Sequence, residues 1–152
     1  MSTGRLLGIA IRSKSRAPMV ELQSCEITCQ DGLVGDFRGR PGARQVTVLA
    51  LEDWQAATSE LEQDLAWTTR RANLLVDGIS LEAKQDAIIR IGGVVLKIRG
   101  ECDPCGRMDE SSAGLQDALR PNWRGGVCCQ VLSGGTIQVG DAVELRQTAS
   151  EA

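Results

Sequence analysis

The sequence has no histidine and no tyrosine, and its only aromatic residues are Phe37, Trp54, Trp67 and Trp123. The lack of histidine excludes serine-histidine catalytic triads and histidine-ligated metal sites. Binding of single-stranded nucleic acid by base stacking requires several aromatic side chains in a basic groove. This chain has few aromatics and a formal net charge of -3 at pH 7. We therefore expect no nucleic acid among its partners.

Long hydrophobic stretches are missing as well. The apolar runs are far shorter than the ~20 residues that span a bilayer, and the first residues lack the long apolar segment and the cleavage site of a secretory signal. We therefore expect a cytoplasmic protein with no membrane partner. A chain of 152 residues, 42% of them hydrophobic, is long and apolar enough for one compact domain with its own core.

Lysine is scarce, with three residues against fourteen arginines. Arginine presents a planar fork that binds phosphate or carboxylate through two parallel hydrogen bonds. Three arginines, Arg38, Arg40 and Arg44, lie in a glycine-rich segment, and a second cluster spans residues 70–73. The backbone amides of such a glycine-rich turn and the guanidinium groups would bind an anion together. The competing interpretation of each cluster is a solvated surface loop.

Six cysteines fall into three groups, which are Cys25 with Cys29, Cys102 with Cys105, and Cys128 with Cys129. In a reducing compartment they indicate thiol chemistry or metal binding rather than disulfides. Only Cys102 and Cys105 have the CxxC spacing of a zinc knuckle. Alternation along a strand places Cys128 and Cys129 on opposite faces, so one of them is expected to pack as a small hydrophobic residue.

Alternating apolar residues predict seven or eight short strands. They are expected at residues 6–12, 19–23, 45–51, 87–91, 94–99 and 127–132, around Ile137, and at 143–145. Glycine-containing turns separate them, and Gly92-Gly93 is the clearest hairpin signal. Helical spacing predicts one helix from Glu52 to about Trp67 and a second, shorter one over 112–119. Many short strands with few helices favour a mainly β fold, a closed antiparallel β-barrel with one or two short helices.

The segment from Gly100 to Gly106 follows a predicted strand directly and contains Cys102, Pro104 and Cys105. Its glycines and proline indicate an irregular loop in which a thiol is exposed. A cysteine reacts as its thiolate, so it requires a nearby positive charge or metal, and Arg107 is the nearest candidate charge in the sequence. A thioredoxin-type dithiol is the competing interpretation, but such a pair opens a helix in a βαβ unit, which this pattern does not show.

The order of these motifs resembles that of the MOSC domain family. The resemblance runs from about Gly8 to Leu145 and rests on the following segments in order: Gly35-Asp36, the strand at 45–51, Arg71-Ala72-Asn73-Leu74, Asp77-Gly78, Pro104-Cys105, Arg124-Gly125-Gly126-Val127, Ser133-Gly134-Gly135-Thr136-Ile137 and Gly140-Asp141. It implies a barrel of the pyruvate-kinase type formed by residues 1–147 as one MOSC domain, followed by a flexible tail at 148–152.

The resemblance also implies a function. In the family, the cysteine that corresponds to Cys105 is proposed to carry sulfur received from a pyridoxal-phosphate cysteine desulfurase, or to ligate molybdenum. Arg71 and Asn73 match positions that hold the phosphorylated pterin of the molybdenum cofactor. The further candidate cofactor-binding residues are Lys14, Arg38, Arg44 and Arg124.

The chain also departs from the family pattern. Arg38 occupies the place where stand-alone relatives often have a histidine, and neither a fused desulfurase nor the N-terminal extension of larger members is present. These departures favour a carrier or delivery role over a self-contained oxidoreductase. We therefore expect two partner proteins, a cysteine desulfurase as donor and a molybdenum-cofactor or metal-cluster protein as acceptor.

The leading hypothesis makes Cys105 the sulfur acceptor, with Cys102 able to resolve its persulfide as a disulfide. One alternative is a structural zinc module in which Cys102 and Cys105 bind the metal together with Cys25 and Cys29. The other is a thiol-disulfide switch between Cys102 and Cys105.

Overall fold

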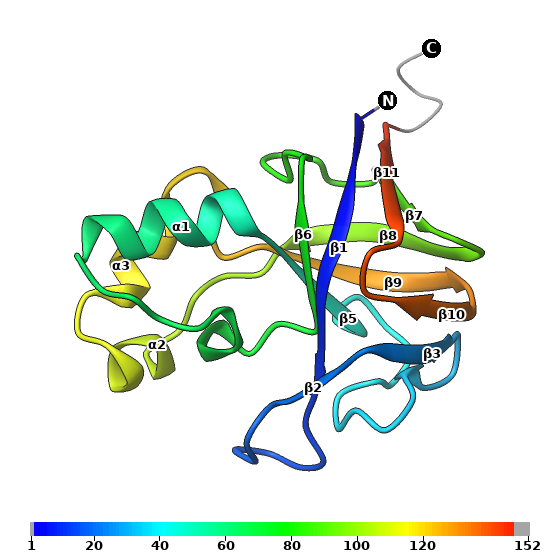
Figure 1. The fold of residues 1–152 in the computed structure, drawn as a ribbon, viewed down its shortest axis with the longest axis horizontal. Helices are drawn as coiled ribbons and strands as arrows, with labels where there is room; N and C mark the ends of the chain where they lie inside the picture. The colour runs from blue at the N-terminus through cyan, green and yellow to red at the C-terminus, as the bar shows by residue number, and fades with distance from the viewer. Residues whose placement is uncertain (1, 148–152) are drawn as a thin grey trace.

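The computed structural model describes residues 2–147, and the tail predicted at 148–152 lies outside them. Seven strands close into a barrel, as the sequence predicts (Figure 1). In order around the ring they are β1 (Ser2–Ile11), β11 (Ala142–Arg146), β7 (Ile88–Ile91), β8 (Val94–Glu101), β9 (Val127–Ser133), β5 (Val46–Ala50) and β6 (Leu74–Asp77).

A few short strands lie outside the ring. β2 (Val20–Leu22) pairs with the end of β1, while β3 (Ser24–Thr28), β4 (Gly32–Leu33) and β10 (Gly135–Gln138) form a separate small sheet. β3, β4 and the ring strand β6 were not predicted. β4 has only two residues and β6 is buried on both faces, so neither shows alternation, whereas the alternation of β3, with Cys25 and Ile27 buried, was missed.

One pairing in the ring is parallel, although the sequence predicts an antiparallel barrel. β5 and β6 run in the same direction, with Val48 opposite Leu74. Parallel neighbours require a crossover connection, which consists here of α1 (Leu51–Glu60) and the 3-10 helix η1 (Trp67–Arg70). The other ring pairings are antiparallel, including the β7–β8 hairpin at Gly92-Gly93.

The barrel interior is the main core. The predicted inward faces of β5 and β8 are confirmed, because Val46, Val48, Leu96 and Ile98 are all buried in it. A second, smaller core lies outside the barrel wall, where Leu49 of β5 faces the helices.

The helices differ from the predicted ones in length. α1 ends at Glu60 because Glu62 adopts a positive φ of 52°, which breaks the helix, and Leu65 reaches the outer core from an irregular segment. The predicted helix at 112–119 begins only at Leu115, after Gly114 with a φ of 87°. The helices after the cysteine loop are α2 (Arg107–Ser111), α3 (Leu115–Leu119) and the 3-10 helix η2 (Pro121–Trp123).

α1, α2 and α3 lie together on one side of the barrel (Figure 1). Across residues 2–147, no helix has the length and apolar character required to cross a membrane. The end of β1, the starts of β6 and β9 and the end of β8 meet around the middle of β5, because Val48 is opposite both Leu74 and Val127, Leu74 is opposite Ile9, and Val127 is opposite Glu101. The chain segments around this point surround the candidate site.

Candidate functional site

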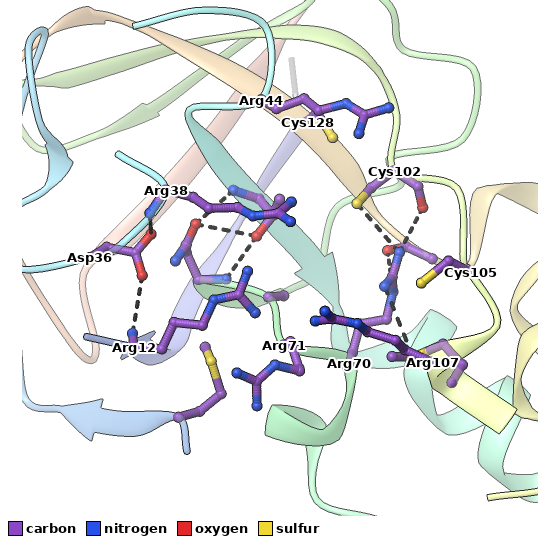
Figure 2. Close-up of a pocket in the computed structure, with 16 residues that line it drawn as sticks. Arg12, Asp36, Arg38, Arg44, Arg70, Arg71, Cys102, Cys105, Arg107 and Cys128 are labelled. Atoms are coloured by element: carbon purple, nitrogen blue, oxygen red, sulfur yellow. Dashed lines mark hydrogen bonds between the residues drawn. The ribbon is translucent and has the colours of Figure 1, made fainter. Parts of the chain in front are cut away.

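A cavity of about 270 Å³ opens where these strands meet. Segments that are distant in the sequence line it, namely the end of β1, the β4–β5 loop, η1 with the residues before β6, the β8–α2 loop and the start of β9 (Figure 2). Its side chains include many arginines and three thiols, and we call it the arginine-thiol cavity. The arginines are Arg12, Arg38, Arg44, Arg70, Arg71 and Arg107, and the thiols are Cys102, Cys105 and Cys128.

The cavity concentrates positive charge in a protein whose net charge is negative. Of the described residues that line it, Asp36 is the only carboxylate. The Asp36 carboxylate accepts hydrogen bonds from the backbone amides of Arg12, at 3.1 Å, and Arg38, at 3.3 Å. Within residues 2–147, none of the six cavity arginines forms an ion pair with a carboxylate. The cavity therefore has guanidinium charge available for an anion.

Two of these guanidinium groups are destabilised in their charged form. Burial, followed by the charges of Arg71 and Arg38, lowers the pKa of Arg12, which is only 8% exposed. Burial, followed by the charge of Arg107, lowers the pKa of Arg71. A bound anion would relieve both effects, because it replaces lost hydration and offsets mutual repulsion.

The backbone directs Arg71 toward the cavity. Arg71 ends η1 in the left-handed conformation, with a φ of 66°, and its Nη2 atom donates to the carbonyl oxygen of Ala17. Its Nε atom is buried and has no hydrogen-bond partner among the described residues. An unpaired buried donor is costly, so Arg71 would be stabilised by a ligand that brings a hydrogen-bond acceptor to this atom.

Cys102 is the cavity thiol whose pKa is lowered. A hydrogen bond with the Cys128 thiol is the largest cause, and together with the charges of Arg70 and Arg44 it outweighs burial and lowers the pKa of Cys102 to about 6. The same hydrogen bond, together with burial, raises the pKa of Cys128. At neutral pH the pair therefore consists of a Cys102 thiolate that accepts a hydrogen bond from the Cys128 thiol.

Arg70 fixes the position of this thiolate. Its Nη2 atom lies 3.3 Å from Cys102 Sγ and donates to the Cys102 carbonyl oxygen at 2.8 Å, while its Nε atom donates to the Gly125 carbonyl oxygen at 3.0 Å (Figure 2). A Cβ atom on residue 125 would lie only 2.6 Å from the Cys102 carbonyl oxygen. Glycine at 125 therefore allows the cysteine loop to pack against the start of β9.

Cys105 differs from Cys102 in exposure. Cys105 is exposed at the cavity, whereas Cys102 is partly buried in its wall. The two neighbouring cysteines of β9 face opposite ways, as alternation predicts, because Cys128 lines the cavity and Cys129 is fully buried in the barrel. Burial raises the pKa of Cys129, so this thiol is the one that packs as a small hydrophobic residue.

The structure brings together most, but not all, of the residues that the sequence proposes. Those that line the arginine-thiol cavity are Arg38, Arg44, Arg71, Asn73, Cys102 and Cys105. Lys14 is exposed in the β1–β2 loop and does not line it. Arg124 does not line it either, because its guanidinium pairs with Glu60 and donates to the carbonyl oxygen of Ala118.

The side-chain amide of Asn73 forms hydrogen bonds within the protein. Its Oδ1 atom accepts from the Thr47 amide and hydroxyl, at 3.0 and 3.2 Å, and its Nδ2 atom donates to the Ala10 carbonyl oxygen at 3.2 Å. Asn73 thus ties β6 to its two neighbours in the ring, β5 and β1. Its contribution to the cavity is to fix the backbone next to Arg71.

Among the arginines and thiols of the cavity, Arg12 and Cys128 were not proposed from the sequence, Arg70 was proposed only as part of the cluster at 70–73, and Arg107 only as the positive charge nearest to the cysteine loop. Arg12 directly follows an alternating strand and Arg70 adjoins Arg71, so their positions were a weak signal. No sequence signal indicated that Cys128 lines the cavity. Alternation predicts that Cys128 and Cys129 face opposite sides of the strand, but it does not predict which residues pack against the outward-facing one.

The zinc alternative depends on four cysteines meeting, and the structure separates them. Cys25 packs against the Glu26 and Val34 carbonyls, and Cys29 contacts the Leu132 carbonyl. Neither lines the cavity, and residues 2–147 contain no group of three or more cysteine or acidic side chains placed to hold a metal ion. All six cysteines are free, so the thiol-disulfide alternative stays a prediction.

Comparisons with known proteins agree with this architecture. The profile of the MOSC domain matches residues 30–144. Among solved structures, the chain is similar to YuaD from Bacillus subtilis, with a TM-score of 0.83 and 19% identity over 97% of this chain and 100% of that one. It is also similar to YiiM from Escherichia coli, with a TM-score of 0.72 and 16% identity over 95% of this chain and 71% of that one. No curated protein matches the sequence.

Proposed function

The chain belongs to the MOSC domain family, and we propose that it is a sulfur carrier or molybdenum-cofactor-binding protein that acts through the arginine-thiol cavity. One observation carries this proposal: guanidinium groups without carboxylate partners and free thiols line the same cavity. Such a site combines an anion-binding surface with a soft sulfur ligand or nucleophile.

The residues of the cavity fit the chemistry of a phosphorylated pterin. The unpartnered Nε atom of Arg71 and the depressed pKa values of Arg12 and Arg71 indicate a site that is stabilised by an anion. Arg71, Arg38 and Arg44 would hold the phosphate, and Cys105 would supply a thiolate ligand to the metal. When bound, the cofactor would provide a redox-active molybdenum centre.

The exposure of Cys105 supports its proposed role as the sulfur acceptor. A protein donor must bring its own persulfide to the accepting thiol, so the acceptor has to be reachable from solvent, as Cys105 is. The donor in this proposal is a cysteine desulfurase, which holds the pyridoxal phosphate. The recipient is a molybdenum-cofactor or metal-cluster protein. Six free cysteines suit the reducing cytoplasm, where we propose that the protein acts.

Sulfur loading from a desulfurase tests this proposal. The reduced protein is incubated with a cysteine desulfurase and L-cysteine, and persulfide adducts are mapped by mass spectrometry. We expect sulfur on Cys105 in the parent protein and its loss in Cys105→Ser. Cys29→Ser is the matched control, because Cys29 is also exposed but lies outside the cavity. Equal loading of Cys105→Ser and parent would contradict the role of Cys105.

A further inference from the structure

Other side chains of the cavity hold the Cys102 thiol in place, and the proposed role of Cys105 as sulfur acceptor does not explain this arrangement. Side chains from three other segments face its thiol, namely Cys128 of β9, Arg70 of η1 and Arg44 of the β4–β5 loop. Arg70 is itself only 8% exposed, and its hydrogen bonds to the Cys102 and Gly125 carbonyls fix the guanidinium. The anionic sulfur is therefore preorganised rather than free to rotate into solvent.

The surroundings of this sulfur define what it would attack. It lines a cavity whose remaining polar groups are mostly guanidinium ions, which bind the oxygens of an oxyanion. A nucleophilic thiolate beside an oxyanion site suits a substrate that carries an electrophilic sulfur bonded to an oxyanion group. Small thiosulfonates have this structure, and thiosulfate is the simplest of them.

The partial burial of Cys102 favours a small donor. Cys105 is exposed, but Cys102 is recessed in the cavity wall, where the persulfide of a folded protein has less access than a small anion. The two thiols would therefore accept sulfur from different classes of donor.

We propose that Cys102 takes the outer sulfur of a small thiosulfonate anion bound by the cavity arginines. The Cys102 thiolate attacks that sulfur, a new S–S bond forms, and the bond to the sulfonyl sulfur breaks with its electron pair leaving on the sulfite. Thiosulfate thus gives a Cys102 persulfide and free sulfite, with no external oxidant or reductant. A nucleophile such as cyanide then takes the outer sulfur as thiocyanate and restores the thiolate. This inference rests on the proposed sulfur-carrier function and names a donor for the same cavity.

The roles of the arginines in this step follow from their positions. Arg70 contacts the attacking sulfur itself. Arg71, Arg44 and Arg107 line the same cavity and would stabilise the negative charge that develops on the leaving sulfite. Cys128 is a positioning residue, since it acts through its hydrogen bond to Cys102.

The test uses the full-length reduced protein with thiosulfate as the probe. Sulfite release is measured in a single turnover, the added sulfur atom is mapped by mass spectrometry, and thiocyanate formation with cyanide reports turnover. We expect the sulfur on Cys102, and a fall in the rate of sulfite release of about tenfold or more in Cys102→Ser, since the thiolate is the nucleophile. Cys29→Ser, the matched control, should behave as the parent.

A second variant distinguishes an effect on the Cys102 thiolate from a general loss of folded protein. Cys128→Ala removes the hydrogen bond to the Cys102 thiolate, so the pH profile of sulfite release should move to higher pH while the rate at high pH recovers. A uniform loss of rate at every pH would mean that Cys128 is only structural, and would overturn its positioning role.

The outcomes distinguish this inference from the proposed function. Sulfur from thiosulfate that appears on Cys105 instead of Cys102, or no sulfite release while a desulfurase still loads Cys105, overturns the inference and leaves the proposed function intact. Sulfite release through Cys102 with no loading by a desulfurase and no pterin binding supports the inference as an activity of its own and overturns the proposed function.

Discussion

The Nη2 atom of Arg70 lies 3.3 Å from the Sγ atom of Cys102, although the two residues are 32 positions apart in the sequence. The same nitrogen donates to the Cys102 carbonyl oxygen, so one buried guanidinium fixes both the backbone and the thiolate of the cysteine loop. This contact links the end of the β5–β6 crossover to the end of β8. After the hydrogen bond from Cys128, the charge of Arg70 helps the partly buried Cys102 thiol to stay charged, because burial alone would raise its pKa.

Replacing Arg70 with methionine should affect both reactivity and stability. The substitution keeps an unbranched side chain but removes a positive charge and three hydrogen bonds to the Cys102 loop and Gly125. We expect the pKa of Cys102 to rise and the free energy of unfolding to fall by about 1–3 kcal/mol, the cost of leaving a buried carbonyl unsatisfied. Alkylation rates against pH and urea unfolding would measure the two effects. Arg90→Ala, an exposed position on β7 outside the cavity, should change neither.

The reactivity of Cys102 should depend on pH in a defined direction. Because its pKa is lowered to about 6, the thiolate should be the main form at pH 7, and should be lost as pH falls through about 6. Iodoacetamide labelling of the Cys102 peptide, followed by mass spectrometry, should therefore show a midpoint near pH 6. The Cys128→Ala variant should move that midpoint upward, and an unchanged midpoint would show that the hydrogen bond does not stabilise the thiolate.

Anion binding should depend on Arg71 more than on an arginine outside the cavity. Arg71→Ala removes a guanidinium whose Nε atom has no protein partner among the described residues. Loss of one charge-assisted contact costs roughly 1.5–3 kcal/mol, which corresponds to about tenfold or more in affinity. Calorimetric titration with a phosphorylated pterin would measure it, with Arg90→Ala as the control. Equal affinities for the two variants would argue against the cavity as the binding site.

Asn73→Ala should lower stability more than ligand affinity. The Asn73 amide is used by Thr47 and Ala10, across the β1–β6–β5 part of the ring, and it is only 6% exposed. We expect a loss of about 1–3 kcal/mol in the free energy of unfolding, since buried backbone groups lose their partners. Urea unfolding and a pterin titration at a temperature where the variant is folded would compare the two effects. A large loss of affinity in a variant of unchanged stability would instead make Asn73 a direct ligand contact.

Substituting Gly125 should disturb the cysteine loop without altering any charge. In Gly125→Ala the new Cβ would lie 2.6 Å from the Cys102 carbonyl oxygen, so the loop or the start of β9 must shift. We expect destabilisation by about 1–3 kcal/mol, as for other overpacked positions, together with slower alkylation of Cys102 at pH 7. Gly93→Ala is the matched control, since a Cβ there meets no atom within 4 Å. Equal effects of the two substitutions would contradict the close packing at Gly125.

Most strands of the barrel were predictable because their residues alternate between the core and the outer face. β6 was not predicted, because Leu74 and Val76 face the barrel core while Leu75 packs in the outer core, so its sequence does not alternate. Alternation in Val46, Val48 and Ala50 identified the inward face of β5, and Gly92-Gly93 identified the β7–β8 hairpin. Helix lengths were less predictable. Leu61 and Leu65 continue the spacing of α1 but pack on the same outer core after the chain has left the helix, because burial requires only that an apolar side chain reach the core.

The sequence by itself determined most of the barrel strands and the absence of histidine chemistry, because periodicity and residue type are local properties. Cys105 and Arg71 became candidates through the order of motifs that resembles the MOSC family. Only the tertiary structure decided that Cys102 is the thiol with the lowered pKa, that Cys128 and Arg70 stabilise its charge, and that Arg124 lies outside the cavity. The physical reason is that a pKa depends on charges and hydrogen bonds a few ångströms away in space, and here those groups come from segments that meet only when the barrel closes.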